Sequence, residues 1–264
     1  MKNKILSHLP ASFPWRGNIH YFDTINSTNT HAKALAAEGA PHGTALIADS
    51  QTGGRGRMGR SFHSPAGSGI YLSVILRPNC PAARLMHLTC AVAVATADGI
   101  ETATGLRPGI KWTNDLVVGQ KKLGGILTEL SLDSHGNVDY AIIGIGINCN
   151  QGADDFPDDI KQIATSLHMC TGRSIDRAAV IAQILLALRE MSENLHDAAT
   201  TLHRYRKDCI TIGQEISLVR GDEIRHGRAL DVDNEGALVV KFPDGHTENV
   251  TSGEVSVRGM YGYV

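Results

Sequence analysis

The sequence predicts an α+β fold in which a large domain of strands and helices, residues 1–212, is followed by a small β-barrel, residues 213–264. Two mainly apolar runs of strand length, 70–76 and 140–148, indicate buried strands in the first domain. Segments rich in alanine and leucine, with apolar residues at helical spacing, lie between and after those runs. After Gly213 the chain changes to short alternating runs separated by turn signals, which is the pattern of a small barrel.

The composition is that of an ordinary globular protein. With 264 residues, of which 42% are hydrophobic and 20% charged, the chain can bury a substantial core. The formal net charge of −2 argues against electrostatic binding of nucleic acid over the protein surface as a whole. The five cysteines are scattered without a C-x-x-C motif, which opposes a disulfide framework or a thiolate zinc site and favours a reducing, cytoplasmic location. No apolar segment approaches the ~20 residues of a membrane span, so we predict neither membrane insertion nor export.

The first elements of the chain are predicted from turn and capping residues. Residues 1–18 are expected to form a short lead-in, too small for a DNA-reading helix-turn-helix domain. A strand is expected at 19–22. The polar cluster 23–29 then supplies capping residues for a helix whose N-terminal backbone N–H groups remain open to a ligand. The side chains at 27–29 could also serve a ligand, although capping alone explains most clusters of this kind.

A loop is predicted at 51–60, after a strand at 44–49, because four glycines and three arginines crowd into ten positions without a helical or strand period. Gly54, Gly56 and Gly59 allow φ > 0 or a close approach of the backbone, and the arginines match the oxygens of phosphate or carboxylate. We therefore expect an anion site. The alternatives are a solvated basic linker and an RGG-like segment on nucleic acid, but the buried strand that follows opposes a disordered tail.

Three further segments combine strands with polar or glycine positions. Residues 111–115 place a cation, an indole, an amide and a carboxylate before an apolar strand, for which an Asn-Asp turn is the simpler explanation. Residues 121–130 pair lysines with two adjacent glycines, so that a ligand could contact the backbone beside an ammonium; solvated edge lysines are the alternative. In the strand 140–148, Gly144 and Gly146 leave notches against which something flat or backbone-sized is expected to pack.

Helices are predicted in three further places. One is expected from about 82 to 104, a second is expected to begin at a cap supplied by Ser174, and a third is expected at 198–209.

Taken together, five motifs occur in the order found in biotin protein ligases, so the chain resembles that family over residues 19–258. They are Ser27-Thr28-Asn29, Gln51 with Gly54-Arg55-Gly56-Arg57-Met58-Gly59-Arg60, Lys111-Trp112-Thr113-Asn114-Asp115, Lys122-Leu123-Gly124-Gly125-Ile126-Leu127, and Gly144-Ile145-Gly146-Ile147-Asn148. The resemblance implies a mixed sheet with helices behind it, followed by an SH3-like barrel. It also implies a two-step ligation that forms biotinyl-5'-AMP from biotin and ATP and then biotinylates a lysine of the biotin carboxyl carrier protein of acetyl-CoA carboxylase or of other biotin-dependent carboxylases. No tightly bound prosthetic group is expected.

The resemblance also implies roles for individual residues. Biotin would be bound by Ser27, Thr28, Gln51, Gly54, Arg55, Arg57, Lys122 and Gly125, among which Arg55, Arg57 and Lys122 would be catalytic. The nucleotide would be bound by Arg57, Phe62, Asn114, Asn148, Glu254 and Arg258. Mg²⁺ would be bound through the ATP phosphates and by Asp115, although the sequence does not fix the metal ligands. Phosphoryl transfer between anions requires positioned cations more than an acid-base pair, which agrees with an arginine-rich loop and no candidate covalent nucleophile.

Two positions depart from the family pattern, namely Thr113 where proline is usual and Phe62 where some members have tryptophan. Neither change removes a charge. Members that also repress transcription carry a DNA-binding domain ahead of the catalytic domain, so we expect a ligase only, with no DNA and no membrane partner. The sequence leaves open whether the protein forms a homodimer.

Two alternative functions remain. The alternative enzyme is a lipoate or octanoate protein ligase or transferase of the same fold, which should prefer a long apolar tunnel. The non-enzymatic alternative is a nucleic-acid-binding repressor, which the net charge opposes.

Overall fold

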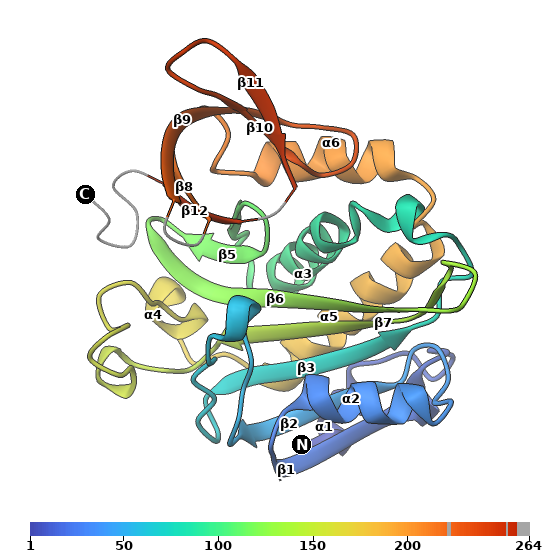
Figure 1. The fold of residues 1–264 in the computed structure, drawn as a ribbon. Helices are drawn as coiled ribbons and strands as arrows, with labels where there is room; N and C mark the ends of the chain where they lie inside the picture. Colours follow the sequence, from blue (N-terminus) through green and yellow to red (C-terminus); the bar gives the residue numbers. More distant parts are fainter. Residues whose placement is uncertain (221–222, 252, 258–264) are drawn as a thin grey trace.

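The core of the first domain is a seven-stranded sheet in the order β1-β2-β3-β7-β6-β5-β4 (Figure 1). The computed structural model describes residues 1–220, 223–251 and 253–257, without the side chains of Arg220, Glu254 and Ser256. β1 and β2 pair in parallel and the other neighbours are antiparallel, so the sheet is mixed, as the resemblance implies. In chain order the strands are β1 Ile19–Ile25, β2 Ala45–Gln51, β3 Gly69–Leu76, β4 Gly109–Lys111, β5 Asp115–Val118, β6 Lys121–Leu132 and β7 Val138–Asn148.

Helices cover both faces of this sheet. α3 (Leu88–Thr104) and α5 (Arg177–Glu193) pack on one face, where Gly99 lets the two helices approach so closely that a Cβ at this position would lie 2.7 Å from the backbone of Ile184. α2 (Thr28–Ala37) packs on the other face against Ile75 and Ile142. The sheet interior is therefore dry, and polar side chains within it need partners of their own.

The first 18 residues are more than a lead-in, because they complete the core. Ile5 of α1 (Lys2–Ser7) and Trp15, the N-cap of the 3₁₀ helix η1 (Arg16–Asn18), are buried in the same hydrophobic cluster as β3 and α3. The Arg16 guanidinium donates hydrogen bonds to the carbonyls of Leu6 and Leu9, which closes the segment on itself.

Two of the helix predictions need correction. The helix expected at 82–104 is divided into a 3₁₀ helix, η3 (Ala82–Leu85), and α3, because Met86 and His87 separate them. α5 is capped by Asp176, whose carboxylate accepts a hydrogen bond from the amide of Ala178 at 3.0 Å, and Ser174 lies too far upstream to cap it. The remaining helical elements are η2 Arg57–Gly59, η4 Ala153–Asp155, α4 Leu167–Thr171 and α6 Ala198–Asp208, the last as predicted. In the part of the chain that the structure describes, none of the helices is both long and apolar enough to cross a bilayer.

The C-terminal residues form a second, strongly curved antiparallel sheet in the order β11-β10-β9-β8-β12, as predicted from the alternating runs (Figure 1). Its strands are β8 Glu215–Arg220, β9 Glu223–Val232, β10 Leu238–Lys241, β11 Thr247–Val250 and β12 Glu254–Val257. The β9–β10 turn is fixed to the first domain, because Trp112 Nε1 donates to the carbonyl of Gly236 at 2.9 Å.

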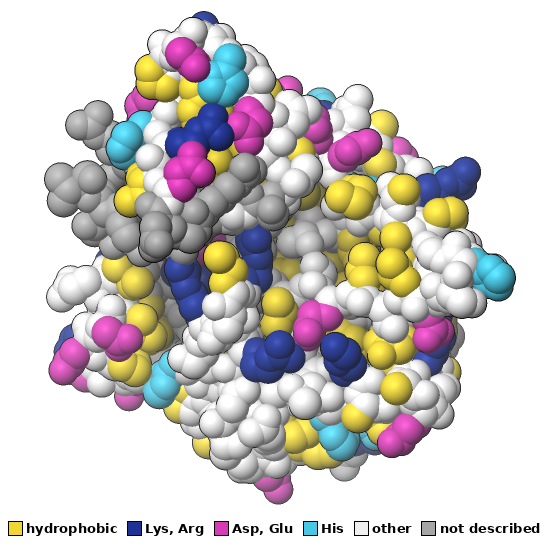
Figure 2. Space-filling view, viewed as in Figure 1, with side chains coloured by type: hydrophobic (Ala, Val, Ile, Leu, Met, Phe, Trp, Pro, Cys, Tyr) yellow, Lys and Arg dark blue, Asp and Glu magenta, His cyan; other side chains and the backbone are white. Residues whose placement is uncertain are grey.

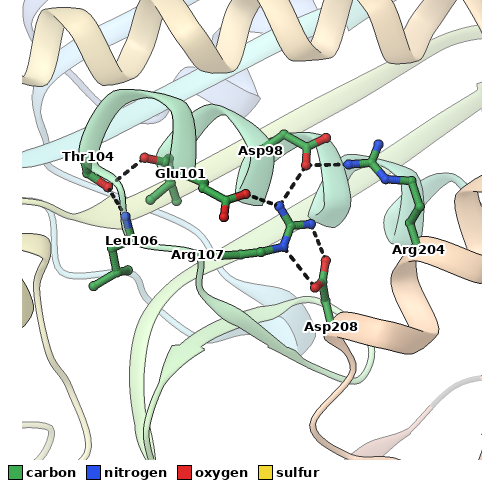
Figure 3. A network of polar contacts seen from close by, with 8 residues as sticks. Asp98, Glu101, Thr104, Leu106, Arg107, Arg204 and Asp208 are labelled. Atoms are coloured by element: carbon green, nitrogen blue, oxygen red, sulfur yellow. Dashed lines mark hydrogen bonds and ion pairs between the residues drawn. The ribbon is translucent and has the colours of Figure 1, made fainter.

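A charged network anchors the segment that leads into β4 (Figure 3). The Arg107 guanidinium bonds to Asp98 and Glu101 of α3 and to Asp208 at the end of α6, while Arg204 also bonds to Asp98. These carboxylates, Asp208 above all, raise the pKa of Arg107 above its ordinary value. α6 is thereby fixed against α3, beside the strands that hold the site residues 111–115.

Candidate active site

Two adjoining cavities open at the end of the sheet where β2 and β7 end and β6 begins. The loop predicted at residues 51–60, called the glycine-arginine loop below, lies at the same end. The inner cavity has a volume of about 50 Å³ and the outer one about 120 Å³. Gly56, Phe62 and Lys122 line both, so these residues mark the junction. The inner cavity is also lined by Ser27, Thr28, Gln51, Arg55 and Gly125, and the outer cavity by Arg57, Arg60, Trp112, Asn114 and Asp115. In Figure 2, Lys and Arg side chains gather around the middle of this face.

Hydrogen-bonding groups converge at the closed end of the inner cavity. Ser27 is the N-cap of α2 and is buried with Thr28. The Gln51 carboxamide accepts from the amide and the hydroxyl of Thr28, at 2.9 and 3.0 Å, and donates to the hydroxyl of Ser64 at 3.0 Å. Gln51 is thus held in one orientation, with its oxygen toward α2, and a ligand here meets a fixed pattern of donors and acceptors.

The backbone of the loop differs in detail from the sequence expectation. Gly59 has φ 77°, but the other left-handed residue is Met58, at φ 56°, and Gly56 has an extended backbone with φ −114°. Gly54 is required for space: a Cβ there would lie 2.4 Å from the Phe62 carbonyl and 3.1 Å from Gln51 Nε2. Gly54 therefore lets the loop pass directly over Gln51.

The notches of β7 are filled as expected, by flat groups. A Cβ at Gly146 would lie 2.7 Å from the ring of Phe62, and a Cβ at Gly144 would lie 2.1 Å from the amide oxygen of Asn29. The Phe62 ring packs edge-to-face on Tyr71, whose hydroxyl donates to the Pro65 carbonyl and has its pKa raised by burial. Phe62 is thus fixed between the two cavities.

Each predicted catalytic cation has a defined acceptor in the structure. Lys122 Nζ lies 2.7 Å from Asp115 Oδ1, and Arg55 Nη1 lies 3.5 Å from Glu129 Oε1. Arg57 donates to Asn114 Oδ1 at 2.8 Å, and the Asn114 amide in turn donates to the Ile126 carbonyl at 2.9 Å. The Lys122 ammonium is set beside Gly125, where a Cβ would lie 3.6 Å from Nζ, so the nearby backbone stays open to a ligand. An anion that spans the junction would be met by cations from both sides.

Comparison with known proteins agrees with this geometry. Residues 21–148 match the Biotin/lipoate A/B protein ligase family, and residues 211–258 match the Biotin protein ligase C terminal domain. The biotin--[acetyl-CoA-carboxylase] ligase of Mycobacterium tuberculosis is 32% identical over 252 residues, which span 93% of this chain and 90% of that protein. The chain belongs to the biotin protein ligase family.

Two further relatives support the assignment of this ligase to the biotin protein ligase family. The bifunctional ligase/repressor BirA of Bacillus spizizenii is 43% identical over 227 residues, which span 85% of this chain and 70% of that protein. Among solved structures, the biotin protein ligase from Aquifex aeolicus in complex with biotin and ATP superposes with a TM-score of 0.77 at 30% identity, covering 91% of this chain and 98% of that one. The resemblance drawn from the five motifs is confirmed.

Not every predicted site residue lies at the cavities of the ligase. Asn148 lines neither of them; its side chain is 7% exposed and donates to the Thr165 carbonyl at 3.0 Å, which fixes the connection after β7. Arg258 lies outside the described residues, and Glu254 belongs to β12 with its side chain outside them. Val255 of the same strand does line the outer cavity, so the C-terminal domain contributes to its wall.

Several polar residues behind the inner cavity were missing from the predicted site. Ser64 fixes Gln51, and Ser73 and Glu129 both bond to Asn29. A signal existed for two of them: Ser73 interrupts the otherwise apolar run of β3, and Glu129 stands within the strand pattern of β6. Such residues are polar where the strand pattern expects apolar side chains, and they need buried partners.

Proposed function

We propose that this ligase binds biotin in the inner cavity and ATP in the outer cavity, and joins them at Lys122. The observation that supports this assignment is the shared wall: Lys122, Gly56 and Phe62 line both cavities, so the reacting ends of two ligands would meet beside one ammonium. Biotin protein ligases form biotinyl-5'-AMP and transfer the biotinyl group to a lysine. The carboxylate and the α-phosphate must then approach each other while both are negatively charged.

In the proposed binding mode, the ureido ring of biotin bonds to Ser27, Thr28 and Gln51 at the closed end. Its carboxylate points toward the loop, where Arg55, Arg57 and Lys122 offset the charge. A biotin carboxylate oxygen attacks the α-phosphorus, and pyrophosphate leaves with the electrons of the broken P–O bond. In the second step the neutral amine of the acceptor lysine attacks the carbonyl carbon of the mixed anhydride, AMP leaves, and the nitrogen loses a proton.

Positioned cations accelerate the first step because negative charge concentrates in its transition state. Lys122 is held by Asp115, and in the closed loop Arg57 is held by Asn114, so both cations are in position once the loop has closed over the ligands. Phe62 lines both cavities at the junction, where its ring would cover the reacting atoms and keep water away.

Mg²⁺ fits this site as an ion held chiefly by ATP. The outer cavity offers the carboxylate of Asp115, and across residues 1–220, 223–251 and 253–257 no group of three or more acidic, histidine or cysteine side chains could hold a metal. One carboxylate plus substrate phosphates is a usual Mg²⁺ environment, and the ion would neutralise phosphate charge there.

The acceptor that we propose is the biotin carboxyl carrier protein of acetyl-CoA carboxylase, in accordance with the names of the Mycobacterium tuberculosis and Paracoccus denitrificans relatives. We further propose that residues 1–212 form the catalytic domain and 213–264 the C-terminal domain, and that the ligase works in the cytoplasm, where ATP is supplied.

The test of this function is mass spectrometry of a purified carrier domain after incubation with the ligase, ATP and either biotin or lipoate. The expected result is a mass increase of one biotinyl group on one lysine, dependent on ATP, and no increase with lipoate. Lipoyl transfer, or no modification by either acid, would contradict the proposal.

The small volume of the inner cavity predicts that the glycine-arginine loop moves when ligands bind. The cavity measures about 50 Å³, whereas pockets for small molecules begin at roughly 300 Å³. Biotin can enter only if a wall opens, and residues 54–62 form the wall that belongs to neither the seven-stranded sheet nor α2. We expect amide hydrogen exchange at 54–62 to be fast in the free enzyme and to slow at least tenfold with biotin and ATP. Unchanged exchange would assign the opening to another wall.

A further inference from the structure

A continuous chain of polar contacts runs behind the floor of the inner cavity. Ser73 Oγ lies 2.8 Å from Thr28 Oγ1 and 2.6 Å from Asn29 Oδ1. Asn29 Nδ2 donates to Glu129 Oε2 at 3.1 Å, and the other oxygen of Glu129 lies 3.5 Å from Arg55 Nη1. The chain therefore connects Thr28, at the closed end, with Arg55, at the loop.

The centre of this chain is rigid because it is buried in a dry part of the sheet. Ser73 is 0% exposed and Asn29 is 5% exposed. The Asn29 amide sits over Gly144, where a Cβ would lie 2.1 Å from Oδ1, so the backbone of β7 is shaped to receive it. Its nitrogen faces two acceptors, Glu129 and the Leu127 carbonyl, and this fixes the oxygen toward Ser73.

The outer end of this chain of polar contacts, the Arg55–Glu129 pair, is partly exposed to solvent. This exposure limits what the pair can contribute to stability. The side chains of Arg55 and Glu129 are 48% and 22% exposed, and ion pairs at such positions contribute little to stability. The pair therefore matters more for the orientation of the Arg55 side chain than for the stability of the fold. One carboxylate oxygen of Glu129 is held by Asn29, so the other has one fixed position from which to hold Arg55 at the wall of the inner cavity.

We propose that Asn29 and Glu129 are positioning residues that tie Arg55 to the hydrogen-bonding end of the biotin site. The inference rests on the proposed binding mode, in which Thr28 bonds to the ureido ring and Arg55 offsets the carboxylate. Asn29 and Glu129 act through those two residues, and the spacing between the two ends of the site is set by the rigid chain. Once the loop has closed, biotin meets a pair of contacts in fixed positions, which lowers the entropy cost of holding it.

The test variant is Glu129→Gln, which keeps the size and an acceptor for Asn29 but removes the charge that holds Arg55. We expect the KM for biotin in adenylate formation to rise about 3- to 10-fold, with kcat changed less than twofold and the KM for ATP unchanged. The matched control is Asp139→Asn, the same chemical change on the neighbouring strand β7, where Asp139 pairs with Arg77 at 3.1 Å away from both cavities. The control is expected to leave all three constants unchanged.

A double-mutant cycle with Arg55→Gln separates positioning from a general structural effect. Without Arg55, adding Glu129→Gln should change the KM for biotin less than 1.5-fold. An equal rise in both backgrounds, a fall in kcat without a rise in KM, or the same shift in the Asp139→Asn control would overturn the proposal. If Glu129→Gln does not fold, Glu129→Asp, which withdraws the carboxylate by one methylene, enters the same cycle. Failure of the wild-type enzyme to form biotinyl-5'-AMP would overturn the proposed function itself, whereas an active wild type with an unaffected variant would overturn only this inference.

Discussion

Replacing Lys122 by alanine is expected to slow the formation of biotinyl-5'-AMP about 100- to 1000-fold, which is the range for loss of one transition-state charge contact. The ammonium lies at the junction of the two cavities, where the carboxylate and the α-phosphate meet. Biotin alone brings one negative charge to the junction, but the transition state concentrates several negative charges there. The affinity for biotin should therefore fall much less than the rate, by about threefold.

The two quantities are measured separately, biotin binding by calorimetry without ATP and adenylate formation by release of pyrophosphate in a single turnover. Lys121→Ala is the matched control, because it removes the same group from the adjacent residue of β6, which lines neither cavity. A loss of biotin affinity as large as the loss of rate would make Lys122 a binding residue only.

Much of the fold was predictable because strands and turns leave local signals. The apolar run of β3 is buried along its whole length, and the glycine notches of β7 receive flat groups as expected. Most residues that line the two cavities belong to one of the five motifs, although Gly54 and Asn148 line neither cavity. Each of these predictions depends on a pattern that can be read within a few consecutive residues.

The features that escaped prediction depend on partners far away in sequence. Trp15 joins the core through its packing against His42 and Gly43, and Asn148 donates a hydrogen bond to the Thr165 carbonyl. The role of Glu129 likewise depends on Asn29, which is 100 residues away in the chain. Tertiary contacts of this kind decide whether a polar residue faces a ligand or another part of the protein, and periodicity does not encode them.

Arg57 occupies a different position from Lys122, and this difference leads to the second large effect. Arg57 reaches from η2 to Asn114, in the turn between β4 and β5, and so fastens the loop across the outer cavity. Biotinyl-5'-AMP is an activated mixed anhydride that must be retained until the acceptor lysine arrives. The loop, fastened through Arg57, is the part of the site that can retain it.

We expect Arg57→Gly to form the adenylate and to release it about 10- to 100-fold faster, because losing a charge-assisted hydrogen bond costs roughly 1.5 to 3 kcal/mol and glycine adds flexibility to the open loop. Lys122 and Arg55 still support the first step. The released adenylate should biotinylate lysines of bystander proteins such as albumin, which a streptavidin blot detects. In the double variant with Lys122→Ala this labelling should disappear, because little adenylate is made. Equal labelling of albumin by the wild type and by Arg57→Gly, with adenylate formation confirmed in the variant, would show that the Arg57–Asn114 contact does not retain the intermediate.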